Sequence, residues 1–297
     1  MTPFIVNMKK VGNKLKLIAL DMDGTLLSPE KHISQENINA IKKKQSQGDI
    51  VMICSGRAPE DIKQILNKYG LDCPLAGSNG TVLEIDSKIL ESVSMNREDV
   101  EEIAQKLDNE QIPYFIYTNQ GIFAPDDWSD RVADILEHTE DLTEDAINDI
   151  KNVTEKPYRS SLIQFFSNLN HLFLKDHIAF NKFFILTYNK TIKEKLTSLL
   201  SRIPNITITT SGPTNIEIMH KDGHKGSGLK KAAEYYNIPL ADTVAIGDSY
   251  NDIPMLEIAG LSIAMANADN KVKNICNKIT LSNSENGVSH ALNKLVE

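Results

Sequence analysis

Residues 15–25 read LKLIALDMDGT, an apolar run that stops at Asp21 and Asp23. The run at 15–20 predicts a buried β-strand, because a short continuous apolar segment is typical of a strand covered on both faces. Two acidic residues at a strand-to-turn exit can both face one cleft, since the turn breaks the strict alternation of the strand. Gly24 leaves the backbone open to the approach of a ligand. This stretch predicts a buried strand with an acidic site at its end.

Strands and helices alternate on both sides of this stretch. The expected strands lie at 15–20, 49–54, 74–85 (a strand, a glycine loop and a hairpin), 243–247 and 262–266. The expected helices lie at 34–47, 59–69, 225–237, 252–260, 268–277 and 285–295. Such alternation indicates an α/β fold, a Rossmann-like core with a parallel sheet and helices on both faces.

The middle of the chain has a different pattern. Only two helices are clear there, one capped by Asn96 and one at 191–201, and several strands alternate polar and apolar residues. Long strands with few helices predict an antiparallel sheet covered on one face. We therefore expect an inserted α/β cap domain at 86–215, within a core formed by 1–85 and 216–297. Its strands are expected at 114–118, 161–166, 182–188, 206–210 and 215–219, with short helices and loop at 126–160.

Composition and charge narrow the class of protein. The 297 residues are 41% hydrophobic and 24% charged, which is ordinary for a soluble globular chain with one or two cores. A net charge of −8 disfavours general binding to nucleic acid or to an anionic membrane. Three widely spaced cysteines suggest neither a disulfide framework nor a zinc site, so a reducing cytoplasm fits best. No run approaches the ~20 apolar residues of a membrane span.

Polar residues stand where the predicted core strands end. Asp21 and Asp23 follow the first strand, Ser55 follows the second, and Asp248 follows the strand at 243–247. Lys225 starts a predicted helix. Ligands of open α/β sheets bind outside the carboxyl ends of the strands, so we expect these side chains at one edge of one sheet.

The residue types at this edge favour phosphoryl chemistry. Carboxylates this close repel each other unless a cation neutralises them, and with Asp248 and Asp252 the edge carries four acids suited to Mg²⁺. With the cation bound, a carboxylate can attack a phosphoryl group, while Lys225 and the Ser55 hydroxyl hold its oxygens. A lone aspartate at a strand end is more often a helix cap or a turn former. The ordered set, each member at its expected structural position, makes a purely structural interpretation improbable.

With DMDGT, SGR, GSNG, HKG and GDSYND in this order, the chain resembles the haloacid dehalogenase superfamily, specifically the Cof-type phosphatases with a large α/β cap. The resemblance covers nearly the whole chain. It implies that Asp21 is the nucleophile that forms an aspartyl-phosphate, and that Asp23 is first the general acid and then the base. It implies a Mg²⁺ site made by Asp21, the backbone carbonyl of Asp23, Asp248 and, through water or as a support, Asp252.

The resemblance also implies a set of phosphate-binding groups. These are the amides of Met22 and Gly56, together with Ser55, Lys225 and Asn251. Asn79 has either a supporting or a substrate-binding role. For Arg57, a salt bridge on the first helical turn and a substrate contact both remain open, and His224 is either neutral or relevant to the substrate.

These features predict a Mg²⁺-dependent phosphatase of the cytoplasm that hydrolyses a small phosphorylated metabolite, such as a sugar phosphate or a phosphorylated cofactor. Asp23 stands where ATPase members of the superfamily carry threonine, which favours transfer to water or an alcohol. A sugar phosphomutase is the alternative enzyme, and a non-catalytic module that binds a phosphorylated ligand is the alternative from another class. Specificity is expected in the cap, whose candidate contacts are Tyr117, Asn119, Trp128 and Arg159.

Overall fold

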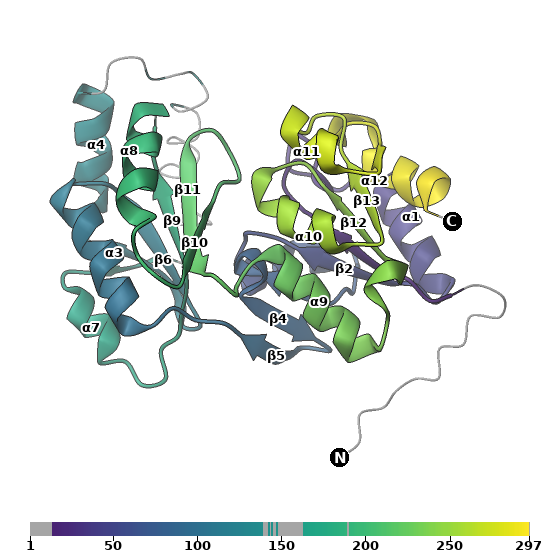
Figure 1. The fold of residues 1–297 in the computed structure, drawn as a ribbon, viewed down its shortest axis with the longest axis horizontal. Helices are drawn as coiled ribbons and strands as arrows, with labels where there is room; N and C mark the ends of the chain where they lie inside the picture. Colours follow the sequence, from purple (N-terminus) through teal and green to yellow (C-terminus); the bar gives the residue numbers. More distant parts are fainter. Residues whose placement is uncertain are drawn as a thin grey trace. The chain divides into compact units, whose positions relative to one another are not determined.

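A computed structural model describes residues 14–138, 142, 144, 147, 163–188 and 190–296. The chain divides into two compact units, one formed by Met1–Ser92 with His224–Glu297 and the other by Val93–Gly223. We call the first the core unit and the second, which interrupts it in sequence, the inserted unit. Figure 1 shows the elements of each unit.

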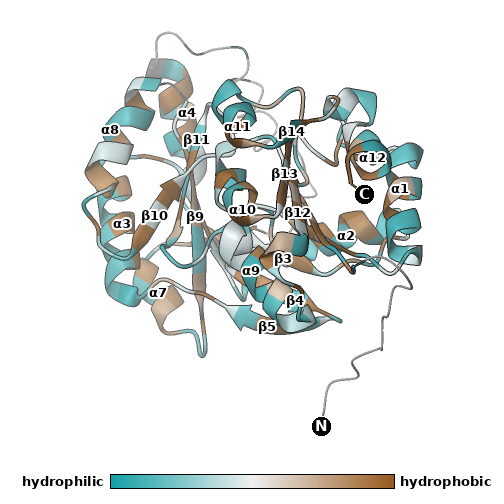
Figure 2. Ribbon diagram, turned by 45° about the vertical axis from the view of Figure 1, so that its right-hand side comes forward, coloured by the Kyte–Doolittle hydropathy of each residue, from teal (hydrophilic) through white to brown (hydrophobic). Residues whose placement is uncertain are grey.

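The core unit is built on one sheet whose central strands are fully buried. The strand order is β14-β13-β12-β1-β2-β3-β4-β5; the strands from β14 to β3 run parallel, and β4 and β5 are antiparallel. Figure 2 shows the hydrophobic colouring of β12 and β13. The bounds are β1 Leu17–Leu20, β2 Ile50–Cys54, β3 Leu75–Gly77, β4 Val82–Ile85, β5 Lys88–Ser92, β12 Thr243–Gly247, β13 Leu261–Ala264 and β14 Lys278–Ile279.

Helices cover both faces of this sheet, as the sequence predicted. Helix α1 packs with α12 on one face, and α9 packs with α10 on the other (Figure 1). The bounds are α1 Gln35–Ser46, α2 Pro59–Lys68, α9 Lys225–Tyr236, α10 Ile253–Ile258, α11 Asn270–Ile275 and α12 Gly287–His290. Within the described ranges, no helix of either unit has both the length and the apolar character needed to cross a membrane.

The inserted unit contains a largely antiparallel sheet with the order β10-β11-β9-β6-β7-β8, in which only β7 and β8 are parallel neighbours. The strand bounds are β6 Tyr114–Thr118, β7 Gly121–Pro125, β8 Ile163–Phe166, β9 Phe180–Leu186, β10 Ile206–Thr209 and β11 Asn215–His220. The helix bounds are α3 Arg97–Asn109, α4 Trp128–His138, α7 Leu169–Phe173 and α8 Lys190–Leu200.

Both faces of the inserted sheet carry helices, so the expectation of one covered face was wrong. Tyr114 and Ile116 of β6 share an apolar cluster with residues of α3 and α8. Phe115 points to the opposite face, where its ring lies 5.0 Å from that of Trp128 on α4. Helix α4 falls inside the acidic segment 126–160, where short helices were expected but the weak periodicity did not show their bounds.

The limits of the two units also differ from the expected boundaries. Strand β5 pairs with β4, so the core sheet continues to Ser92 rather than ending at residue 85. Strand β11 pairs with β9 through Ile218 and Phe183, so residues 216–223 belong to the inserted unit. Strand β5 is hard to predict from the sequence, because most of its side chains are exposed, including Ile89 at 61%.

Candidate active site

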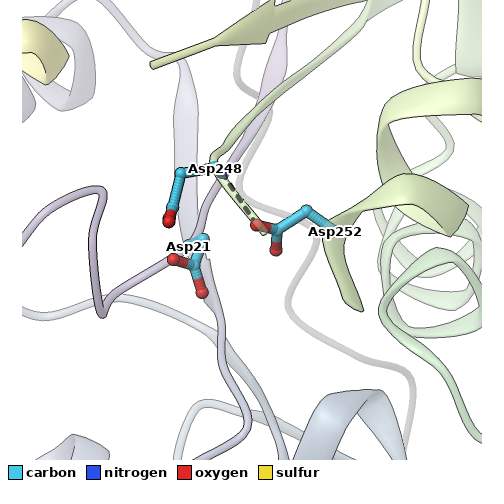
Figure 3. Close-up of side chains that lie close together, drawn as sticks. All are labelled: Asp21, Asp248 and Asp252. Carbon is cyan, nitrogen blue, oxygen red and sulfur yellow. Dashed lines mark hydrogen bonds between the residues drawn. The ribbon is translucent and has the colours of Figure 1, made fainter. Parts of the chain in front are cut away.

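Three aspartates meet at one edge of the core sheet. Asp21 directly follows β1 and Asp248 directly follows β12, and these strands are parallel neighbours in register. One carboxylate oxygen from each, with one from Asp252, lies within 4.8 Å of the others. Figure 3 shows the three side chains converging from separate segments. The structure thus brings together three of the four acids that the sequence singled out.

Lys225 supplies the positive charge inside this cluster. It is the first residue of α9 and fully buried, and its Nζ lies 2.5 Å from Asp21 Oδ1 and 2.6 Å from Asp252 Oδ1. Burial, reinforced by the charge of Asp252, holds the pKa of Asp21 well above its usual range, although Lys225 opposes this. Burial and Asp252 likewise raise the pKa of Asp248 to about 6. The single positive charge of Lys225 cannot neutralise three ionised carboxylates.

Asp252 acts mainly as a support for its neighbours. Its Oδ1 accepts from Lys225, and its Oδ2 accepts the backbone N–H groups of Asp248 and Ser249, each at 2.9 Å. The dashed line in Figure 3 marks the bond from Asp248. Gly247 allows this packing, since a Cβ there would lie 2.6 Å from the carboxyl carbon of Asp252. Both oxygens of Asp252 are therefore engaged by the protein.

Asp248 is held by hydroxyl groups on two sides. Thr25 Oγ1 donates to its Oδ1 at 2.7 Å, and Ser249 Oγ donates to its Oδ2 at 3.0 Å. Gly24, with a φ of +81°, lies so close that a Cβ would collide with the carboxylate. Thr25 lies within the DMDGT motif, but no role for it was predicted from the sequence. The signal that could have revealed it is a hydroxyl placed four residues after the first aspartate.

This donor set fits a hard divalent cation. Asp21 and Asp248 present carboxylate oxygens, the ligand type that Mg²⁺ prefers, and the buried cluster carries more negative charge than Lys225 balances. Asp252 accepts three hydrogen bonds from the described residues, whereas Asp248 accepts two and Asp21 accepts one. Asp21 and Asp248 therefore keep more free lone pairs, and they are the residues that suit direct coordination. The carboxylate of Asp23 does not belong to the cluster.

Asp23 instead forms a separate ion-pair network. Its Oδ2 accepts from Arg57 Nε at 2.6 Å, and its Oδ1 accepts from Arg57 Nη2 at 2.8 Å and from Lys31 Nζ at 3.0 Å. Burial by itself would raise the pKa of Asp23, but the hydrogen bonds and charge of Arg57 outweigh it and hold that pKa well below its usual range. Arg57 also pairs with Asp61 at 2.7 Å on the first turn of α2. The pairing of Lys31 with Asp23 was not predicted, because no motif in the sequence includes Lys31.

The expected phosphate-binding residues lie on the loops at the same edge. Ser55 follows β2 and is buried, and its hydroxyl accepts the backbone N–H of Arg57 at 3.3 Å. Met22 is fully buried between the two motif aspartates, and Gly56 follows Ser55. Asn251 lies in a short 3₁₀ turn next to Asp252, where its Nδ2 donates to Asn79 Oδ1 at 3.1 Å.

His224 has a structural role at the start of α9. Its Nδ1 accepts the backbone N–H of Ser227 at 3.2 Å, and Ser227 Oγ accepts the backbone N–H of His224 at 3.0 Å. These reciprocal bonds form a capping box, which satisfies N–H groups of the first helical turn. The cap fixes where α9 begins, and thereby the position of Lys225.

Three of the four residues expected to contact the substrate from the inserted unit are described by the structure, and each contacts other residues of that unit. Trp128 is buried against Phe115, as a core residue would be. Asn119 bonds within its own unit, donating to the His177 carbonyl at 2.9 Å and accepting from the Ala179 N–H at 2.8 Å. Tyr117 lies 4.5 Å beneath the ammonium of Lys182. Arg159 lies outside the described residues.

Comparison with known proteins identifies the family. A model of the haloacid dehalogenase-like hydrolases matches residues 18–292. Phosphatase YwpJ of Bacillus subtilis is 31% identical over 95% of this chain and 100% of its own length. The 5-amino-6-(5-phospho-D-ribitylamino)uracil phosphatase YwtE of the same organism is 35% identical over 95% of this chain and 98% of its own length.

A solved structure supports the same assignment. A haloacid dehalogenase-like hydrolase from B. subtilis superposes with a TM-score of 0.83 and 29% identity, covering 95% of this chain and 100% of its own. The family match spans nearly the whole chain, and the curated relatives that share its length are phosphatases. The chain therefore belongs to the haloacid dehalogenase-like hydrolase family, as an enzyme of the phosphatase type.

Proposed function

We propose that this protein is a Mg²⁺-dependent phosphatase that hydrolyses a small phosphorylated metabolite through a phosphorylated Asp21. The observation that carries the proposal is the placement of the Asp21 carboxylate, which is buried, paired with Lys225 at 2.5 Å and grouped with Asp248. Mg²⁺ held by Asp21, Asp248 and the Asp23 carbonyl would offset negative charge on the nucleophile and the phosphoryl group.

In the first half of the reaction, a carboxylate oxygen of Asp21 attacks the phosphorus atom. The new oxygen–phosphorus bond forms as the ester bond to the leaving group breaks, and the leaving alcohol takes a proton from Asp23. Lys225, Asn251, the Ser55 hydroxyl and the amides of Met22 and Gly56 orient the phosphoryl oxygens. In the second half, Asp23 removes a proton from water, whose oxygen attacks the phosphorus as the bond from phosphorus to Asp21 breaks, which releases phosphate and restores the Asp21 carboxylate.

The ion pair between Asp23 and Arg57 affects both halves of the reaction, because it influences the protonation state of Asp23. Arg57 and Lys31 favour the ionised form of Asp23, which is the form needed by a base that activates water. An acid must instead carry a proton. Asp23 is therefore expected to leave Arg57, or to be shielded from it, when the substrate binds. The side chain of Asp23 is 39% exposed, so a ligand can reach it.

Substrate choice is assigned to the inserted unit, because the core residues described above recognise only the phosphoryl group and the cation. The relative YwtE is named for a phosphorylated ribitylamino-uracil. We therefore place phosphorylated sugars and polyols, including that compound, first among the substrates to test. The cytoplasm remains the proposed compartment, since all three cysteines are free and two of them, Cys54 and Cys73, are buried thiols.

A metabolite screen tests the proposal. Purified protein is assayed with Mg²⁺ and with EDTA against sugar phosphates, polyol phosphates and phosphorylated cofactors, and substrates are ranked by kcat/KM. We expect free phosphate in stoichiometric amounts with the dephosphorylated alcohol, and only with Mg²⁺. An isomerised sugar phosphate without net phosphate release would point to a phosphomutase. Binding without turnover, with Asp21→Asn behaving like the wild type, would point to a binding module.

A further inference from the structure

Asn79 occupies a strained turn at the meeting point of three segments of the site. Ser78, Asn79 and Gly80 have consecutive positive φ values of 48°, 61° and 86°. Asparagine and glycine tolerate this left-handed conformation, but serine adopts it at a cost. Backbone strain of this kind persists where the surroundings enforce it, and such residues cluster at functional sites. A simple reversal of chain direction therefore does not account for the backbone strain at Ser78 and Asn79.

The turn is fixed to two of the phosphate-binding segments through its backbone. The Asn79 N–H donates to the Ser55 carbonyl at 2.9 Å, and the Ser78 N–H donates to the Arg57 carbonyl at 2.7 Å. On its other side, a Cβ on Gly80 would collide with the His224 carbonyl, one residue before Lys225. The backbone of the turn thus connects the Ser55 loop to the start of α9.

The Asn79 side chain contacts the third segment. Its Oδ1 accepts a hydrogen from Asn251 Nδ2 at 3.1 Å, across 172 residues of sequence. Both side chains are buried, with Asn79 1% exposed and Asn251 5% exposed. Among the residues that the structure describes, Asn251 Oδ1 has no hydrogen-bond partner. The hydrogen bond to Asn79 therefore determines the orientation of the Asn251 side-chain amide.

We propose that Asn79 is a positioning residue that keeps the Asn251 amide turned with its N–H groups toward the phosphoryl group. This inference rests on the proposed function, in which Asn251 binds phosphate. A side-chain amide nitrogen carries two hydrogens, so one can bond to Asn79 and the other remains for a phosphoryl oxygen. A flipped amide would instead direct its oxygen, an acceptor, at phosphate oxygens, which are also acceptors. The Asn79 Oδ1 atom is turned to Asn251, so its bond acts through that residue rather than on the substrate.

A double-mutant cycle tests this role. The variants are Asn79→Gly, which keeps the left-handed backbone but removes the amide, Asn251→Ala, and the two combined. The control is Asn237→Gly, because Asn237 is an exposed left-handed asparagine (φ 54°) at the end of α9. Each protein is assayed for inorganic phosphate affinity in Mg²⁺ by calorimetry, for kcat and KM on p-nitrophenyl phosphate, and for Tm.

Losing a hydrogen bond to a charged group should weaken phosphate binding by about 10- to 100-fold in Asn251→Ala. Asn79→Gly should weaken it by about 3- to 30-fold and raise KM, and the double variant should stay within about 2-fold of Asn251→Ala. The control should bind phosphate like the wild type. Unchanged affinity in Asn79→Gly, or losses that multiply in the double variant, would overturn the inference. If Asn79→Gly fails to fold, Asn79→Ser repeats the cycle with the residue type that the turn already accepts at position 78.

Phosphate affinity also separates this inference from the proposed function. A wild type that binds phosphate but hydrolyses no phosphomonoester would refute the proposed function, and the affinity cycle would still decide the role of Asn79. A wild type that binds no phosphate in Mg²⁺ would refute both.

Discussion

Replacing Asp248 by asparagine should make the metal-free protein more stable while it abolishes activity. In the absence of a cation, the half-buried Asp248 carboxylate lies near Asp21 and Asp252, and burial with the charge of Asp252 raises its pKa. An asparagine has the same shape, carries no charge and still accepts the hydrogen bond from Thr25. The hydroxyl of Ser249 can turn to accept from the new amide. The substitution removes a charge that the fold disfavours.

The size of the effect follows from the shift in pKa. The pKa of Asp248 rises from 3.8 to about 6, and one pKa unit is worth about 1.4 kcal/mol. Because the folded state binds this proton more tightly than the unfolded chain, its contribution to stability is complete below pH 3.8 and is lost as the pH rises through about 6. At pH 7 without metal, the free energy of unfolding of Asp248→Asn should therefore exceed that of the wild type by about 2–3 kcal/mol.

Urea denaturation at pH 7, in EDTA and in Mg²⁺, measures this directly. Mg²⁺ at about 100 times its dissociation constant should stabilise the wild type by about 2.7 kcal/mol and the variant far less, because the variant has lost a ligand. The exposed Asp72→Asn change is the control and should respond to Mg²⁺ as the wild type does. A variant less stable than the wild type in EDTA, or equal stabilisation of both by Mg²⁺, would refute the reasoning.

Two further perturbations test other parts of the structure. Arg57→Met should let the pKa of Asp23 in the substrate-free protein rise toward its ordinary value, which an NMR titration of the carboxyl carbon measures, and an unmoved pKa would show that Arg57 does not set the ionisation of Asp23. Lys182→Met, which breaks a buried pair with Glu217 at 2.9 Å, should lower the free energy of unfolding in urea by about 3–5 kcal/mol. The double change Lys182→Met with Glu217→Leu should recover most of that loss, and a double variant as unstable as the single one would contradict the assignment.

The convergence of the aspartates could be predicted because backbone rules decide it. Buried strands that alternate with helices form a parallel sheet, so their carboxyl ends share one edge. The register that pairs Ala19 with Ala245 brings Asp21 and Asp248 to that edge. Lys225 could be placed in the same way, since it begins a helix with a clear apolar face.

Features that depend on side-chain direction could not be predicted. Asp23 follows Asp21 by two residues, yet its carboxylate turns to Arg57 rather than to the cluster, and no sequence pattern specifies that rotamer. The bond between Asn79 and Asn251 joins positions with no shared periodicity. Short helices were expected within 126–160, but the bounds of helix α4 could not be predicted because its apolar positions are embedded in a segment rich in acidic residues. Packing against Phe115 supplies the stability that local propensity does not show.

Direct detection of phosphorylated Asp21 tests the central claim. The enzyme is mixed with substrate and Mg²⁺, quenched in acid within its first turnovers and digested, and the peptide that contains Asp21 is analysed by mass spectrometry. We predict a phosphoryl group on Asp21 in the wild type and none in Asp21→Asn, which should release no phosphate. Turnover by the wild type without a phosphorylated peptide, together with hydrolysis by Asp21→Asn that survives, would contradict the assignment of Asp21 as the nucleophile.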